Sequence, residues 1–572
     1  MPMLVLLVVS SILLLRARKP PTHRLPPSPR GLPIASHLHQ LGALLHRALH
    51  ALAAAHGPVM LLRLGRVPTL VVSSADAARE VLQLQDHAFA NRPSLAIPRR
   101  LLYGCTDIAF APHGAYWRGV RKIAVLHLLS PARVRAYRGV REEEVAELVR
   151  KVERQAHAGG GVVRLSELLS GFAKDVNGRI VLGVRASGGA GWRAKVDALL
   201  EEANALLGEF HVGDYFPWLA WVAAVDETDA KVSRAFERID RILEEIVVAA
   251  SAGTGGRHVE AFVHVLLSLQ SDLSGAGWRL TRDNVKALLE NQNFVFAGTD
   301  VLLCWNRCTM HVDGGQQRRR RLRQARRRGQ RGVVHQMLQP RGRGASTAAD
   351  GGSVSAMAKF GGGSDHDGSC KRDLFGAGTD STIIVLEWVM AELLRKLQQE
   401  IRRHCTKSHS LVITEQDLPA MEHLRAVIKE TMRLHPPGPL LVPRESMQHT
   451  KVHFYDVPRG TRIIVNAWAV GRDPTVWDNA DEFRPERFVD SEVDFRGRRS
   501  QLIPFGARRR MCPGIGFTTS VVELALANLV GQFNWTIPTL ENKASAVVDM
   551  EEAPGITSRK KVPLCAVAAR PA

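Results

Sequence analysis

The sequence predicts a mainly α-helical fold with a small β subdomain, preceded by an N-terminal membrane anchor. Apolar residues recur at helical spacing through most of residues 41–295, which is typical of amphipathic helices around a core. Short apolar runs at 62–64 and 69–72 favour strands. Residues 1–15 are almost wholly apolar. Together these patterns indicate a large helical protein with a minor sheet and an apolar leader.

Composition limits the classes of protein that fit. The chain has 572 residues, 45% of them apolar, so it can build a sizeable core. Its seven cysteines show no framework spacing, which favours a reducing compartment without structural disulfides. Of the net charge of +21, residues 301–370 carry +9, which leaves +12 on the other 502 residues. We therefore expect no nucleic-acid partner.

Residues 1–19 are interpreted as a signal-anchor. The apolar run is shorter than the ~20 residues of a full membrane span. Its positive charge, at Arg16, Arg18 and Lys19, follows the apolar part, whereas a cleaved signal carries it in front. A buried terminal helix is the alternative. The six prolines of residues 20–33 then forbid helix and favour a stiff hinge or a plain linker.

Residues 301–370 break the pattern of the chain. They include 11 arginines within 318–343 and then a Gly- and Ser-rich run, with neither helical nor strand periodicity. We expect this segment to be a disordered insert. It is either a basic arm for nucleic acid or membrane, or a translated intron or frameshifted segment. The second reading is favoured because Ala-Gly-Thr-Asp occurs on both sides, at 297–300 and 377–380, as if one helix motif were interrupted.

One cysteine near the C-terminal end has an unusual setting. A lone cysteine is most often a small buried hydrophobe. Cys512, however, follows Phe505 and Arg510 in a loop and directly precedes Pro-Gly and a helix-favouring run at 515–530. A thiolate needs nearby donors and a helix N-terminus, and a cysteine-ligated haem iron needs the same arrangement.

This loop resembles the haem-binding signature of the cytochrome P450 family, Phe-x-x-Gly-x-Arg-x-Cys-x-Gly. Phe505, Arg510, Cys512 and Gly514 match it, whereas Arg508 stands where the family has Gly. The resemblance implies that Cys512 ligates the iron of haem b (iron protoporphyrin IX) and that these neighbours bind the cofactor. An Arg in place of this Gly costs roughly 1–2 kcal/mol if φ must be positive, and its bulk would crowd the haem edge.

Further motifs follow the family order. Trp117 and Arg121 are four residues apart and share a helix face, which by itself indicates a surface cation–π pair. The resemblance implies that both contact a haem propionate, as does Arg444. Glu430 and Arg433 alone would be a common surface pair. With a later Pro-Glu-Arg-Phe, the resemblance implies a buried ion triad of the residues Glu430, Arg433 and Arg487.

Residues 377–382 resemble the oxygen-activation motif of the family. Taken alone, they read as a helix start with small residues and an acid. The resemblance implies that Asp380, with Ser381 and Thr382, delivers protons to bound O2. It also implies that the substrate meets four residues of this and other segments, namely Phe210, Phe216, Ala377 and Ile556.

The resemblance implies a haem-thiolate monooxygenase domain over 34–572, interrupted at 301–370. It would insert one oxygen atom from O2 into a small apolar plant metabolite. NADPH-derived electrons would come from NADPH-cytochrome P450 reductase, with cytochrome b5 as a second partner. The motifs resemble plant microsomal members, which implies a single anchor in the endoplasmic reticulum membrane and a cytosolic domain. Two segments also resemble grass enzymes that oxidise indole-derived (benzoxazinoid-pathway) defence compounds.

Two alternatives stay open. One is an isomerase or dehydratase of the same family that needs no external O2, and the acid and hydroxyl at Asp380 and Ser381 argue against it. The other is a catalytically impaired product of a disrupted gene. It rests on the insert, on Arg508 and on the missing Pro-containing spacer after Arg395.

Overall fold

The computed structural model describes residues 24–158, 161–183, 206, 211–225, 227–252, 261–272, 280–294, 377–397, 413–538, 548–555 and 557–571. The expected anchor at 1–19, the start of the hinge and the whole insert at 301–370 lie outside the described residues, as do Phe210 and Ile556. The described part of the hinge, residues 24–33, contains no helix, as its prolines predict. Its Arg24 backbone N–H donates to Asp456 Oδ2 at 2.9 Å.

Helices account for most of the described elements, as predicted. They are α2 (Leu45–His56), α3 (Ala75–Arg79), α4 (Ala96–Leu101), α5 (Ala115–His127), α6 (Pro131–Ala136), α7 (Arg138–Ala158), α8 (Leu165–Asn177), α10 (Val222–Val225), α11 (Thr228–Ser251), α12 (Phe262–Asp272), α13 (Arg282–Phe294), α16 (Ala377–Glu392), α18 (Glu422–Leu434), α19 (Ala467–Val470) and α20 (Ile515–Gln532).

The strands form three small sheets. They are β1 (Val59–Leu64), β2 (Val67–Val72), β3 (Val162–Arg164), β4 (Arg444–Glu445), β5 (Thr450–Val452), β6 (Tyr455–Val457), β7 (Arg462–Val465), β8 (Asn534–Thr536) and β9 (Cys565–Ala569). The sheets run in the orders β1-β2-β7-β4, β3-β9-β8 and β5-β6. β1 and β2 are antiparallel, and β2 pairs with β7 in parallel. The predicted strands at 62–64 and 69–72 lie within β1 and β2.

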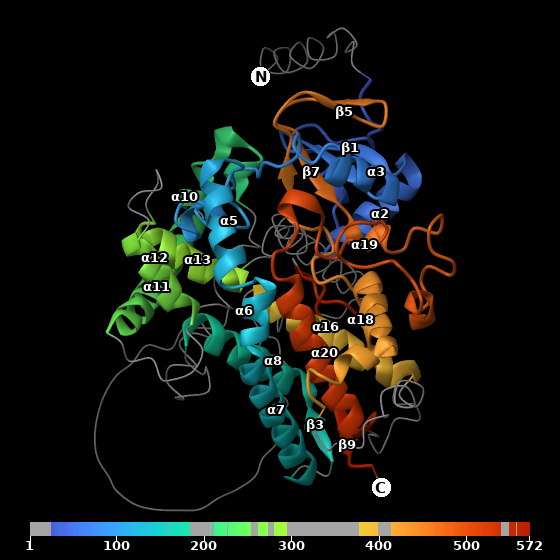
Figure 1. The fold of residues 1–572 in the computed structure, drawn as a ribbon. Coiled ribbons are helices and arrows are strands. Elements are labelled where there is room, and N and C mark those ends of the chain that lie inside the picture. Colours follow the sequence, from blue (N-terminus) through green and yellow to red (C-terminus); the bar gives the residue numbers. More distant parts are fainter. Residues whose placement is uncertain are drawn as a thin grey trace, which may run out of the picture. The chain divides into compact units, whose positions relative to one another are not determined.

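Two helices that are apolar on nearly all sides form the centre of the core. Most side chains of α16 and α20 are buried, because helices without a polar face must be surrounded by protein. They pack against each other and against α18, while α8 packs on α16 (Figure 1). This packing fixes the N-terminus of α20, and with it the cysteine loop just before it.

A membrane-spanning helix is not found in the described part of the chain, where every helix is too short or too polar to cross a bilayer.

Candidate active site

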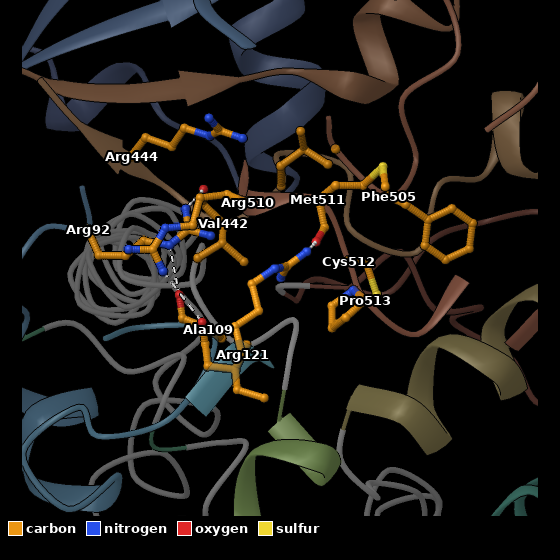
Figure 2. Close-up of a pocket in the computed structure, with 13 residues that line it drawn as sticks. Arg92, Ala109, Arg121, Val442, Arg444, Phe505, Arg510, Met511, Cys512 and Pro513 are labelled. Atoms are coloured by element: carbon orange, nitrogen blue, oxygen red, sulfur yellow. Dashed lines mark hydrogen bonds between the residues drawn. The ribbon is translucent and has the colours of Figure 1, made fainter. Parts of the chain in front are cut away.

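The cysteine loop borders a hollow of about 540 Å³, part of which is open to solvent. Its lining brings together five of the predicted site residues. Arg121 comes from α5, Arg444 from β4, and Phe505, Arg510 and Cys512 from the loop before α20. In Figure 2 the side chains of Arg444 and Arg510 lie away from Cys512 and Phe505. The cavity therefore has a cationic end at Arg444 and Arg510 and a sulfur end at Cys512, where the Arg121 side chain reaches the Met511 carbonyl.

The Cys512 sulfur lies at the start of α20. The Cys512 backbone N–H donates to the Phe505 carbonyl at 3.0 Å, and this bond closes the loop. Burial raises the pKa of the Cys512 thiol, while the Gly514 backbone N–H and the charge of Arg121 act in the opposite direction. A Cβ at Gly514 would lie 3.7 Å from the sulfur. These donors support a thiolate, and a metal cation bound to the sulfur deprotonates it outright.

Four arginines line the cavity although little carboxylate is present to balance them. Burial is the largest cause in each case, and it lowers the pKa of Arg444 to about 10 and that of Arg510 to about 9. The pKa of Arg92 is also lowered, by burial and then by repulsion from Arg510 and Arg444. Asp86 approaches Arg444 Nη1 only to 3.6 Å. The cavity thus favours an anionic occupant.

Each of these four arginines donates to at least one backbone carbonyl. Arg510 donates to the carbonyls of residues 90, 108 and 111, and its guanidinium lies 4.1 Å from the Trp117 ring centre. Arg92 Nε donates to the carbonyl of residue 109, and its Nη1 donates to those of residues 442 and 443. Arg121 Nη2 donates to the Met511 carbonyl at 2.7 Å. Their bonds hold the cavity walls in place.

Arg444 differs from them in having an unused donor. Its Nη2 donates to the Ala507 carbonyl at 3.2 Å, whereas its buried Nη1 has no hydrogen-bond partner among the described residues. A buried donor without an acceptor is costly, so this atom fits an anionic ligand. A cysteine at one end and an unsatisfied guanidinium N–H at the other fit a haem with its propionates.

Trp117 does not line the cavity. It is buried, donates from Nε1 to the Ile108 carbonyl at 3.0 Å, and lies under Arg510. It therefore supports the arginine that lines the wall. Arg92, by contrast, lines the cavity but was missed from the sequence, because no recognised motif contains it.

Arg508 adopts the left-handed backbone conformation that a Gly at this position would adopt without strain. Its φ is +56°, and it begins a 3-10 turn at Arg508–Arg510. The side chain is exposed and is not part of the cavity lining. The expectation that its bulk crowds the cavity is therefore wrong for this structure, and the cost of roughly 1–2 kcal/mol falls on the loop backbone.

Glu430, Arg433 and Arg487 meet in the core as an ion triad. Both Glu430 oxygens accept from Arg433 at 2.7 Å, and Oε1 also accepts from Arg487 Nε at 3.1 Å. The Arg484 backbone N–H adds a further bond to Oε1 at 2.7 Å. Remaining N–H groups of Arg433 donate to the carbonyls of residues 471, 480 and 482. The triad braces α18 against the chain that leads to the cysteine loop.

Among the described side chains of α16, none lines the cavity. Asp380, Ser381 and Thr382 are buried, and the Asp380 carboxylate pairs with Arg559, which belongs to none of the recognised motifs. Phe216 is also buried, but it packs in a cluster beside β1 and β2. Ala377 is the first residue of α16, and the placement of its side chain lies outside the described features.

The model of the family described as Cytochrome P450 matches residues 26–302 and 369–560, leaving 303–368 unmatched. "Cytochrome P450 71A1" of Persea americana is 39% identical over 544 residues, which covers 93% of this chain and 91% of that protein. "Cytochrome P450 736A117" of Prunus mume is 38% identical over 554 residues, covering 95% and 90%. A zebrafish cytochrome P450 structure with abiraterone shares the fold, with a TM-score of 0.64 and 21% identity over 92% of this chain and 100% of that one.

Proposed function

The chain belongs to the cytochrome P450 family. We therefore propose that Cys512 ligates the haem iron and that Arg444, with other arginines of the cavity, binds the haem propionates. The protein is a haem-thiolate monooxygenase, an oxidoreductase whose family uses haem b, O2 and NADPH-derived electrons. What carries the proposal is one cavity with Cys512 at its sulfur end and the unsatisfied Arg444 Nη1 at its cationic end.

The chain's own groups would act on the cofactor as follows. The Gly514 N–H and the start of α20 stabilise negative charge on the Cys512 sulfur. Arg444, Arg121 and Arg510 would offset the two propionate charges. Phe505 lines the cavity beside Cys512, Trp117 supports Arg510 from behind the wall, and Gly514 lies next to the sulfur. Bound haem supplies the activation of O2 for oxygen insertion.

Proton delivery is assigned to Asp380, with Ser381 and Thr382. The three residues lie in the first turns of α16 and are buried. They would therefore pass protons to a site that bulk water does not reach directly. The substrate would meet Ala377, Phe210, Phe216 and Ile556. Similarity to plant relatives supports a small apolar plant metabolite as the substrate, and an indole-derived compound is the narrower proposal.

We further propose that the electrons arrive from NADPH-cytochrome P450 reductase, with cytochrome b5 as an accessory donor. The apolar run at 1–15 and the proline-rich residues 20–33 support anchoring in the endoplasmic reticulum membrane with a cytosolic domain. An O2-independent isomerase would turn over without NADPH, so NADPH dependence of turnover separates that alternative from the monooxygenase.

The reduced carbon-monoxide difference spectrum of the full chain tests the haem site. We expect a thiolate-type Soret band in the unmodified chain and its loss in Cys512→Ser. Cys565→Ser is the matched control, because Cys565 is an exposed cysteine on β9. Loss of the band in the control but not in Cys512→Ser would contradict the assignment.

Arg508 favours a second candidate, a catalytically impaired family member. Its left-handed φ supports a loop weakened by strain, although the exposed side chain leaves the cavity clear. Under this alternative the unmodified chain takes up no haem or gives only the neutral-thiol band. Arg508→Gly would then restore the thiolate-type band.

A further inference from the structure

The Asp380 carboxylate forms a bidentate ion pair with Arg559. Arg559 Nε donates to Asp380 Oδ2 at 3.1 Å, and Arg559 Nη2 donates to Asp380 Oδ1. The Thr557 hydroxyl donates to Oδ2 at 3.3 Å. The two charged side chains are 7% and 18% exposed, so the pair is shielded from most of the solvent. Both carboxylate oxygens are therefore occupied by donors from a segment 177 to 179 residues further along the chain.

The segment that supplies these donors is a tight turn fixed at several points. The Ala553 N–H donates to the Arg559 carbonyl at 2.8 Å, and the Arg559 N–H donates to the Thr557 carbonyl at 2.9 Å. Between these residues, the Ser558 carbonyl accepts from Trp388 Nε1 of α16 at 2.6 Å, and its N–H donates to the Pro437 carbonyl at 3.1 Å. The backbone of this turn is thus anchored to α16 itself.

This placement has a chemical consequence. A carboxylate whose two oxygens accept from a guanidinium is held as the anion and has no proton to pass on. Asp380 can relay a proton only when the Arg559 pair opens and one oxygen is released. Ile556, three residues before Arg559, is one of the residues expected to meet the substrate, although its own placement lies outside the described residues. A displacement of this turn would therefore change the partner of Asp380.

We infer that Arg559 is a positioning residue that holds Asp380 as a paired carboxylate, and that it couples proton delivery to movement of the segment that carries Thr557 and Arg559. This inference rests on the proposed role of Asp380. Arg559 acts through Asp380 and needs no contact with the cofactor. Removing its charge should alter proton delivery only while Asp380 is present.

A double-mutant cycle on thermal unfolding tests the pair itself. Arg559→Gln, Asp380→Asn and the double variant are made in the full chain, with Lys561→Gln as the control. Lys561 lies two residues after Arg559, and its ion pair with Glu551 is exposed to solvent. We expect the summed Tm losses of the single variants to exceed the loss of the double variant by about 2 °C. Additive losses would overturn the pair.

NADPH oxidation by the full chain with a plant NADPH-cytochrome P450 reductase, without added substrate, tests the coupling. We expect Arg559→Gln to change the solvent deuterium isotope effect on this rate, and Arg559→Lys to restore most of the unmodified value. In the Asp380→Asn background, Arg559→Gln should cause no further change. An equal change in both backgrounds would overturn the inference, because Arg559 would then act without Asp380.

The two proposals fail in different ways. Loss of the thiolate-type carbon-monoxide band from the unmodified chain would refute the proposed haem site, while the thermal cycle would still decide the ion pair. If the unmodified chain gives the thiolate-type band but Asp380→Asn leaves the solvent isotope effect unchanged, the coupling is refuted. The result of the thermal cycle would not alter that conclusion.

Discussion

At the Glu430 centre, hydrogen-bond donors and acceptors balance within the protein, whereas at the Cys512 cavity they do not. Glu430 has arginine partners at 2.7 and 3.1 Å, and the remaining N–H groups of Arg433 reach carbonyls. Arg444, also buried, keeps Nη1 without a hydrogen bond, with only the Asp86 carboxylate 3.6 Å away. The first centre is complete as folded, and we propose that a ligand completes the second. Other buried atoms of the described residues also lack a hydrogen-bond partner, so it is the combination of the Arg444 donor with Cys512 in one cavity that supports a binding site there.

The largest effect is expected where the balanced centre is broken. Glu430→Gln removes the carboxylate and leaves Arg433 and Arg487 with uncompensated buried charge, which costs about 3–5 kcal/mol of unfolding free energy. Urea unfolding of the full chain measures this loss. Glu422→Gln, at an exposed position of the same helix, should change the unfolding free energy by less than about 0.5 kcal/mol. Equal losses in the two variants would remove the distinction.

A second buried ion pair, at Glu552, should show itself in the pH dependence of stability. Despite burial, bonds from His46 and Arg47 lower the pKa of Glu552 to about 2, from the ordinary 4.5. Since the folded pKa lies below the unfolded one, the stabilisation of about 3 kcal/mol is complete above pH 4.5 and is lost as the pH falls towards 2. Unfolding measured from pH 6 to pH 2.5 checks this.

Glu552→Gln should abolish most of that acid-dependent loss. The neighbouring Glu551 is exposed, so Glu551→Gln should leave the acid limb of the profile unchanged. A profile that is flat in the unmodified chain over this range would contradict the assignment of the stabilisation to Glu552.

The unbalanced centre should respond through its ligand. Arg444→Gln removes the guanidinium charge together with the Nη1 donor that makes no hydrogen bond. We expect haem to bind about tenfold more weakly, which corresponds to about 1.4 kcal/mol. Haem titration of the apoprotein, followed by absorbance, measures the affinity. Arg509→Gln is the matched control, because Arg509 also pairs with Asp86 but does not line the cavity. Haem affinity that falls equally in both variants would show that loss of the Asp86 pair, and not of the cavity donor, is responsible.

The smallest expected effect concerns the loop backbone. Arg508→Gly relieves the left-handed strain and should raise the unfolding free energy by about 1 kcal/mol, since part of the gain is offset by the greater freedom of Gly when unfolded. Arg509→Gly, at the next position and without a positive φ, should lower it by about 0.5–1 kcal/mol. Thermal unfolding of the two variants gives the two signs, and a shared sign would contradict the role of φ.

Sequence reasoning succeeded where chemistry depends on short spacing. Glu430 and Arg433 are three residues apart on a helix, so their pairing follows from helical geometry. The cysteine loop and the helix after it are adjacent in the chain, so the placement of Cys512 at the start of α20 was also predictable. The helical fold with small sheets follows from apolar periodicity in the same way.

Long-range closure was decided by tertiary structure alone. Arg92 reaches the carbonyls of residues 442 and 443 from 350 residues away, and Arg559 reaches Asp380 across 179. Neither contact leaves a local pattern, because it depends on how helices and turns pack. Residue types and local spacing thus determined which groups could do the chemistry. Packing determined which of them meet, which conformation Arg508 takes, and which buried charge is left for a ligand.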